Sequence, residues 1–136
     1  MNRTLVIIKP DAVKAKHIGD IIKRFEDEGY TIVGLKMLQL TKDEAENFYN
    51  VHRGKPFFEN LIKFMTSGNC VPMVLERDEN IIQDVRNFIG ATDSRKAEKG
   101  TIRADYGTDN SQNAVHASDS EESARVEINF FFPNLI

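Results

Sequence analysis

The sequence contains one cysteine, no tryptophan and no long hydrophobic run. Cys70 has no second cysteine to pair with, and no signal peptide precedes it, so a reducing, cytoplasmic setting is expected. No apolar segment approaches the ~20 residues of a membrane helix, so no membrane association is expected. The formal net charge is −3 with acids and bases scattered, which argues against specific binding of nucleic acid.

Familiar phosphate-binding loops are also missing. Neither a P-loop nor the Gly-rich loop of protein kinases occurs among the eight glycines. Repeats, low-complexity tracts and linker-like segments are absent as well. The 136 residues suffice for one domain whose core needs neither metals nor disulfides. We therefore expect residues 1–136 to form a single domain.

Hydrophobic periodicity predicts strands and helices in alternation. The predicted strands cover residues 4–8, 30–40, 70–75 and 114–116. The predicted helices cover residues 18–28, 41–49, 56–65, 80–89 and 120–131. This order predicts an α+β fold, a ferredoxin-like βαββαβ sandwich with helices on one face of a four-stranded antiparallel sheet. Pro72 indicates an edge or irregular strand, and residues 91–112 are predicted to be a long polar loop.

One short stretch, residues 113–120, combines a lone histidine with signals for the start of a helix. Two overlapping capping boxes, Ser118-x-x-Glu121 and Asp119-x-x-Glu122, predict that a helix begins just past His116. The N-terminus of a helix favours phosphate, and a neutral imidazole is a nucleophile that can carry a group covalently. Judged on local spacing alone, an ordinary surface histidine remains the commoner interpretation.

Other candidate binding residues have equally plain structural interpretations. Lys9 follows a buried strand and Arg86 flanks the stripe of a helix, yet each could be merely solvated. Arg103 lies in the polar segment, where Thr101-Ile102-Arg103 offers a hydroxyl and a guanidinium together. Phe57 and Phe58 open a helix that is richer in aromatics than one core stripe needs. Either one of these rings faces outward and stacks on a ligand, or both pack in the core.

Taken together, the motifs resemble those of nucleoside diphosphate kinases, over nearly the whole chain from Arg3 to Phe132. Five blocks carry the resemblance, in the order of the family: Lys9-Pro10-Asp11-Ala12-Val13, Phe48-Tyr49 with Pro56-Phe57-Phe58, Gly90-Ala91-Thr92, Gly100-Thr101-Ile102-Arg103, and Asn113-x-x-His116-x-Ser118-Asp119-Ser120. The resemblance implies transfer of the γ-phosphate of a nucleoside triphosphate, mainly ATP, to a nucleoside diphosphate. The implied route is ping-pong, through phosphorylated His116.

The resemblance also assigns roles to the phosphate-binding residues. Lys9, Arg86 and Arg103 would clamp the phosphates, while Tyr49 and Thr92 would donate hydrogen bonds to phosphate oxygens. Such a set suits phosphoryl transfer, where a protein mainly positions groups and neutralises charge. Mg²⁺ would bridge the phosphates with few or no direct protein ligands.

Further roles concern the nucleoside and the histidine. Asn113, together with Lys9, would reach the ribose, while Phe57 would stack on the base with Leu61 nearby. Stacking without base-edge hydrogen bonds implies broad tolerance of bases. Glu127 would hold the second ring nitrogen of His116, and Ser118 would support Glu127. His17 and His52 match no catalytic position and are expected at the surface.

Some positions depart from the usual pattern of the family. Ala117 replaces a glycine after the histidine, which requires a negative φ there. Asp93-Ser94 replaces Asn-Pro, in a loop that takes part in subunit contacts in the family, and Asn110 stands where an apolar residue is common. A homo-oligomer is implied, with tetramer and hexamer both open.

Two other functions stay open at this level. Four-stranded sheets of this topology also bind single-stranded RNA, but no strand here carries the aromatic signature of that class. A phosphohistidine relay protein would pass its phosphate to another protein. The combination of Tyr49, Phe57 and Asn113 favours a nucleoside pocket instead.

Overall fold

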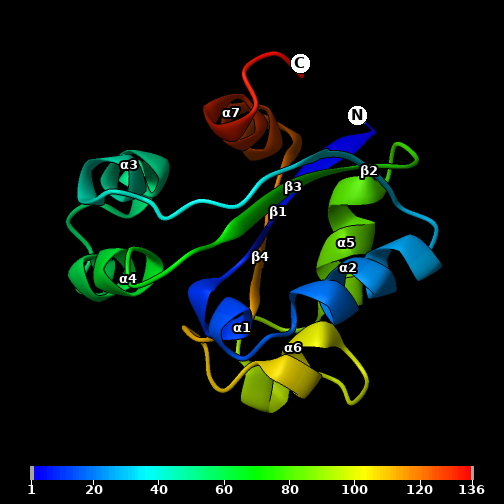
Figure 1. The fold of residues 1–136 in the computed structure, drawn as a ribbon, viewed down its shortest axis with the longest axis horizontal. Coiled ribbons are helices and arrows are strands. Elements are labelled where there is room, and N and C mark those ends of the chain that lie inside the picture. The colour runs from blue at the N-terminus through cyan, green and yellow to red at the C-terminus, as the bar shows by residue number, and fades with distance from the viewer. Residues whose placement is uncertain (1, 136) are drawn as a thin grey trace.

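The computed structural model describes residues 2–135, which form a four-stranded sheet surrounded by helices (Figure 1). The strands are β1 (Arg3–Ile8), β2 (Thr31–Leu35), β3 (Val71–Glu76) and β4 (Val115–Ala117). The α-helices are α1 (Pro10–Lys14), α2 (Ile18–Asp27), α3 (Lys42–Phe48), α4 (Phe58–Met65), α5 (Ile81–Ile89), α6 (Ile102–Tyr106) and α7 (Glu121–Phe131). Two short 3₁₀ helices are η1 (Asn50–His52) and η2 (Ser94–Lys96).

The sheet has the order β2-β3-β1-β4, and every neighbouring pair is antiparallel. This topology confirms the ferredoxin-like α+β prediction. Of the two expectations for Pro72, the edge strand is wrong, because β3 lies between β2 and β1, whereas the irregular strand is confirmed by the interrupted pairing with β2. The regular β2–β3 ladder ends at Leu35 opposite Met73, beside Pro72, which lacks an N–H, and it is followed only by the isolated bridge between Leu38 and Cys70.

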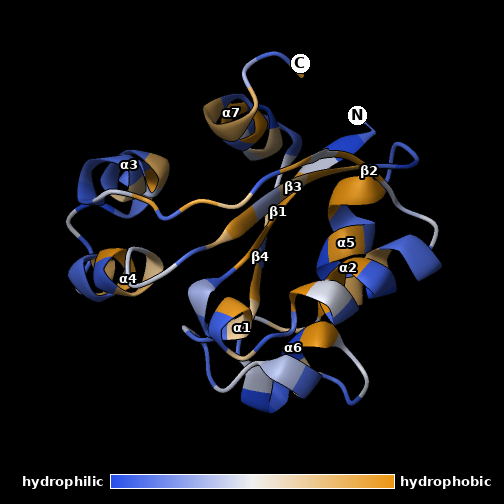
Figure 2. Cartoon of the chain, viewed as in Figure 1, coloured by the Kyte–Doolittle hydropathy of each residue, from blue (hydrophilic) through white to orange (hydrophobic). Residues whose placement is uncertain are grey.

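Helices cover both faces of the sheet, not the single face that was expected. Along β1 the side chains of Leu5 and Ile7 join one core cluster, while Val6 and Ile8 join the other. Helices α2 and α5 pack on the second face, whereas α3, α4 and α7 pack on the first (Figure 1). The central strands are correspondingly hydrophobic over most of their length (Figure 2). Because neighbouring side chains point to opposite faces, an uninterrupted apolar strand needs cover on both.

Several helix ends lie where the sequence predicts them. Gly29 and Gly90 follow α2 and α5 with φ of 96° and 100°, a region that glycine enters at little cost. Thr41 forms the predicted capping box with Glu44. At α7 the predicted boxes are wrong by one or two residues: the cap is Ser120, which pairs with Ser123.

Two helices escape the sequence prediction, α1 and α6. Both have only five residues, too few to display a hydrophobic period. Within the predicted polar loop, Thr101 caps α6 by accepting from the N–H of Ala104. Asp93 caps η2 and also binds the Arg95 guanidinium with both carboxylate oxygens. A side-chain cap thus orders the turn where the family has proline.

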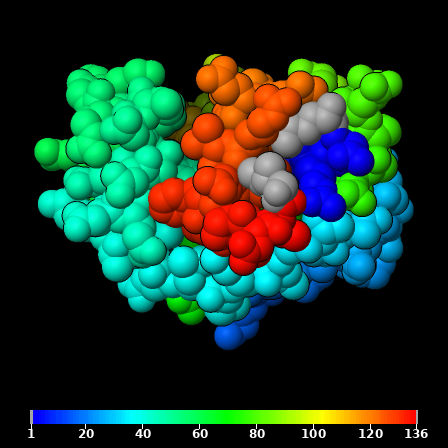
Figure 3. Space-filling model, turned by 90° about the horizontal axis from the view of Figure 1, so that it is seen from above, coloured from blue at the N-terminus to red at the C-terminus, as the bar shows by residue number. Residues whose placement is uncertain are grey.

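The end of the described chain returns to its beginning. The guanidinium of Arg3 donates to the carbonyl of Leu135, and Figure 3 shows the C-terminal segment, in red, beside the N-terminal strand, in blue. Helix α7, which precedes this segment, is therefore held at both ends on the sheet. None of the helices in residues 2–135 is long and apolar enough to cross a membrane.

Candidate active site

A cavity of about 1060 Å³ opens between the α3–α4 pair and the start of α7. Its lining includes all but one of the residues assigned to the site from sequence: Lys9, Tyr49, Phe57, Leu61, Arg86, Thr92, Arg103, Asn113, His116 and Glu127. Ser118, the exception, is fully buried behind the wall. Residues that are far apart in sequence therefore meet in one place, as the motif blocks predict.

His116 is held by a carboxylate. Its Nε2 lies 2.7 Å from Oε1 of Glu127, and the same oxygen accepts from the hydroxyl of Ser118 at 2.8 Å. Glu127 lies in the second turn of α7, while Ser118 directly follows β4, so both elements fix the pair. A carboxylate acceptor places the imidazole proton on Nε2 and leaves the lone pair of Nδ1 available.

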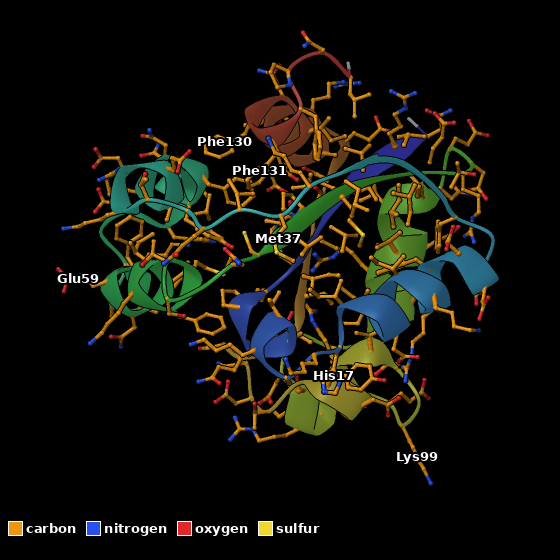
Figure 4. The ribbon with its side chains drawn as sticks, viewed as in Figure 1. His17, Met37, Glu59, Lys99, Phe130 and Phe131 are labelled. Atoms are coloured by element: carbon orange, nitrogen blue, oxygen red, sulfur yellow. The ribbon has the colours of Figure 1, made fainter. Side chains whose placement is uncertain are left out.

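The other ring nitrogen of His116 meets no hydrogen-bond partner within residues 2–135. Aromatic side chains pack beside the imidazole instead. Phe48 and Tyr49 stand roughly perpendicular to it, with ring centroids 5.6 and 6.3 Å away. Phe48 in turn packs against Phe130 and Phe131 of α7, whose side chains reach towards α3 in Figure 4. The ring is therefore oriented by packing as well as by Glu127.

Two buried cations, Lys9 and Arg103, line the cavity together with the histidine. The Arg103 guanidinium donates to the carbonyls of Gly90 and Val115, at 3.1 and 2.9 Å. Burial and the neighbouring Arg86 lower the pKa of Arg103 to about 10. The ammonium of Lys9 donates to Oδ1 of Asn113 at 2.8 Å, and burial together with Arg103 lowers the pKa of Lys9 to about 8. Asp11 and Asp109 partly offset this effect on Lys9, but among the described residues neither Lys9 nor Arg103 forms a salt bridge, and such cations favour an anionic ligand.

Unpaired polar atoms point to the same conclusion. Tyr49 is buried with no hydrogen-bond partner for its hydroxyl in the described chain, and burial raises the pKa of that phenol. Nε of Arg103 is likewise buried and unpaired. Such groups carry a free-energy cost in the ligand-free protein, and a ligand with several acceptor oxygens would remove it.

The outer part of the cavity is apolar on one side and polar on the other. Phe57 is 47% exposed, whereas Phe58 is buried, so only one ring of the pair is available to stack. Leu61 lies beside it in the lining. Thr92 faces them, and its carbonyl accepts from the Asn113 amide at 2.8 Å. Both ends of that amide are thus held by the protein.

Two histidines differ from the expectation of surface positions. His52 is half-buried in the cavity lining, with its ring near Tyr49 and Phe57 and an unpaired, buried Nδ1. It lies three residues after Tyr49, and this closeness was the only available signal. His17 is half-buried as well but lies outside the cavity, where it stacks on Tyr106 of α6 (Figure 4).

The alanine after the histidine fits its backbone. Ala117 lies in β4 and is not among the described residues with positive φ. The β-carbon of Ala117 therefore causes no backbone strain, and the condition that φ be negative at this position is met. Positive φ occurs instead three residues earlier, at Ala114.

The depressed pKa of Lys9 predicts a pH dependence. As pH rises through about 8, the ligand-free protein loses the Lys9 charge, so kcat/KM should fall above that pH. A bound anionic ligand should move the corresponding fall in kcat to higher pH. Unfolding would not explain this loss of activity. In the unfolded chain Lys9 keeps its proton up to its ordinary pKa of 10.5, so the contribution of Lys9 to the free energy of unfolding rises between about pH 8 and pH 10.5. A flat kcat/KM across this range would contradict the assignment.

The fold and the cavity define a class of protein: a ferredoxin-like domain that presents a histidine and buried cations to an anionic ligand. A family model described as nucleoside diphosphate kinase matches residues 2–135. The nucleoside diphosphate kinase of Staphylothermus marinus is 59% identical over 130 residues, which are 96% of this chain and 92% of that protein. That of Desulforapulum autotrophicum is 53% identical over 135 residues, 99% of this chain and 97% of that protein.

Solved structures agree with these relatives. The Aquifex aeolicus nucleoside diphosphate kinase superposes with a TM-score of 0.94 at 50% identity, covering 98% of this chain and 96% of that chain. The Halobacterium salinarum enzyme, solved in complex with CDP, gives 0.93 at 41% identity, covering 98% and 90%. The chain belongs to the nucleoside diphosphate kinase family. It is an enzyme that transfers phosphate from a nucleoside triphosphate to a nucleoside diphosphate by a ping-pong mechanism.

Proposed function

We propose that His116 is the residue that carries the phosphate, and that Nδ1 is the attacking atom. The observation behind this proposal is the 2.7 Å contact between Nε2 and Glu127, which occupies one nitrogen and leaves the other open. The Nδ1 lone pair forms the N–P bond while the bond from phosphorus to the bridging oxygen breaks. Its electrons go to the departing nucleoside diphosphate.

The proposed step needs no proton transfer from the nucleophile. The proton on Nε2 stays in place, and the positive charge that develops on the ring faces the Glu127 carboxylate. Arg103, Arg86 and Lys9 face the phosphate oxygens, where they balance charge in the transition state. The unpaired hydroxyl of Tyr49 supplies a further hydrogen bond. A β-phosphate oxygen of an incoming nucleoside diphosphate then reverses the step.

We further propose that Phe57 stacks on the base, with Leu61 beside it. Asn113 and Lys9 contact the ribose, and Thr92 contacts a phosphate. Support comes from the half-exposed ring of Phe57 at the cavity mouth and from the polar wall opposite. A stacking contact reads no base edge, so both purines and pyrimidines fit.

Replacing Phe57 tests this placement. Phe57→Ala should raise KM roughly tenfold for every base, because one base–aromatic stack is lost. The conservative variant Phe57→Tyr keeps an aromatic face and should stay near the wild-type KM. Steady-state kinetics with GDP, CDP and dTDP as acceptors measure both. An effect confined to one base would contradict simple stacking.

Mg²⁺ is the proposed cofactor, held through the nucleotide. No group of three or more metal-ligating side chains occurs in residues 2–135. The inner cavity is lined by the cationic side chains of Lys9, Arg86 and Arg103. These residues fit a metal whose ligands are mainly phosphate oxygens and water. When bound, the ion would neutralise part of the phosphate charge.

We propose a homo-oligomer, tetramer or hexamer, because β2 is an edge strand and Leu35 and Met37 beside it are 50% and 53% exposed. Met37 projects from the connection after β2 in Figure 4. We propose a cytoplasmic setting from the single, buried Cys70, and a single domain over residues 1–136.

A pulse–chase experiment tests the proposed function. The protein is incubated with γ-labelled ATP and Mg²⁺, freed of nucleotide, and then given GDP or dTDP. The label should stay on the protein, resist base, and leave as GTP or dTTP. Label that neither diphosphate removes would favour a relay protein that passes phosphate to another protein.

A further inference from the structure

A strained turn lies directly before His116. The N–H of Val115 donates to the carbonyl of Asn113 at 2.9 Å, across Ala114, whose φ is 74°. A three-residue turn with a positive central φ is the rarer and more strained of the two γ-turn forms. Residues other than glycine avoid this region, because the β-carbon crowds the backbone. Something must therefore hold Ala114 in place.

Two hydrogen bonds clamp this residue on either side. The N–H of Ala114 donates to Oδ2 of Asp11 at 3.1 Å, and its carbonyl accepts from the N–H of Lys9 at 2.8 Å. Ala114 is fully buried, so water cannot take the place of either partner. One bond is made by the backbone of Lys9 and survives any substitution of its side chain. The other depends entirely on the Asp11 side chain.

The clamped turn connects the two halves of the active site. On one side, Oδ1 of Asn113 accepts a hydrogen bond from the Lys9 ammonium at 2.8 Å. On the other, the Val115 carbonyl accepts a hydrogen bond from the Arg103 guanidinium at 2.9 Å. The next residue, His116, pairs with Ile7 of β1. A change of φ at Ala114 would shift these groups relative to one another. The Asp11 carboxylate is held there at a cost in free energy. Burial raises the pKa of Asp11, and its Oδ1 is buried without a hydrogen-bond partner in the described chain.

We propose that Asp11 is a positioning residue that holds the Ala114 turn and thereby places His116 against the cationic groups. The proposal rests on the proposed role of His116. Asp11 acts through the backbone of Ala114, and its carboxylate also attracts the Lys9 ammonium. It differs in this from Glu127, which contacts the imidazole itself.

The test measures the rate constant of protein phosphorylation at saturating ATP in single-turnover experiments. Asp11→Ala removes the acceptor and should lower this rate about tenfold. Asp11→Asn removes the negative charge but keeps an oxygen acceptor for Ala114, so its rate should stay within about threefold of wild type. A full loss in Asp11→Asn would mean that charge matters and the turn does not, which overturns the proposal.

The decisive arm combines Asp11→Ala with Ala114→Gly. Glycine adopts a positive φ without strain, so the turn should persist without Asp11, and most of the lost rate should return. Lys16→Gly is the matched control, because exposed Lys16 is the other described non-glycine residue with positive φ, at 67°. It should raise the thermal stability of Asp11→Ala without restoring the rate.

Each outcome decides between positioning and general stability. Rescue by Ala114→Gly alone supports positioning, whereas rescue by both glycines, or by neither, overturns it. His116→Ala run alongside separates this inference from the proposed function. If His116→Ala is inactive and Asp11→Ala is normal, only the positioning role fails. If His116→Ala is phosphorylated normally, the proposed function fails first.

Discussion

His116→Ala should reduce phosphate transfer by a factor on the order of 10⁴ or more, because the covalent intermediate can no longer form. The variant should also take up no label from γ-labelled ATP. The fold should survive, since His116 is one side chain at a cavity wall and Glu127 keeps its hydrogen bond from Ser118. Circular dichroism and thermal unfolding check the fold, and a coupled assay of GTP formation checks the rate.

The chain offers a matched control for this substitution. His17 is also half-buried and also contacts an aromatic ring, but it lies outside the cavity, against Tyr106. His17→Ala should keep both labelling and turnover. Near-normal turnover in His116→Ala, with the fold intact, would contradict the proposed mechanism.

Arg103→Ala should lower kcat by roughly 10²–10³-fold, the cost of removing one preorganised group that stabilises transition-state charge. It should also destabilise the fold by about 1–3 kcal/mol, because the buried carbonyl of Val115 and the partly buried carbonyl of Gly90 lose a donor. The expected loss of activity is far larger than partial unfolding explains. Kinetics at a temperature where the variant remains folded separate the two effects.

Two comparisons sharpen the Arg103 result. Arg125→Ala removes an exposed arginine from the outer side of α7 and should leave kcat unchanged. Low concentrations of guanidinium should partly restore Arg103→Ala, since the ion can occupy the vacated space, whereas urea, which is neutral, should not. Restoration by both, or an activity loss that tracks stability across temperature, would make Arg103 a structural residue.

Long, periodic elements of this fold were predictable from sequence. The spacing of Ile21 and Phe25 predicts α2, and the apolar run of β1 predicts a buried strand. The same run also implied cover on both faces, since four consecutive residues from Leu5 to Ile8 are fully buried. Element order alone predicts helices on one face only, because it does not specify where the alternate side chains of β1 lie.

Short and tertiary features were out of reach. Helix α6 has five residues within a polar segment, and its boundaries depend on the Thr101 cap and on packing. The start of α7 is predicted to within one residue, but its cap is not, because the apparent cap Ser118 donates its hydroxyl hydrogen bond to Glu127 instead. Several capping residues in a row leave the register open until a tertiary contact removes one of them.

The site itself was predicted through the motif blocks, not through local physics. A histidine before a capped helix, taken alone, favours a surface role, and only the combination of blocks implied one cavity. The blocks could not reveal which ring nitrogen faces Glu127, nor that Ala114 adopts a positive φ. His52 was assigned to the surface because no motif claims it, although the cavity brings its ring to Phe57.

The identity of the phosphorylated atom tests the account most directly. Protein containing ¹⁵N-histidine is phosphorylated with ATP, freed of nucleotide, and examined by ¹⁵N and ³¹P NMR at a pH where phosphohistidine is stable. The account predicts one phosphorylated histidine, His116, with phosphorus bonded to Nδ1 and Nε2 still protonated against Glu127. Phosphorus on Nε2, or on any other residue, would contradict it.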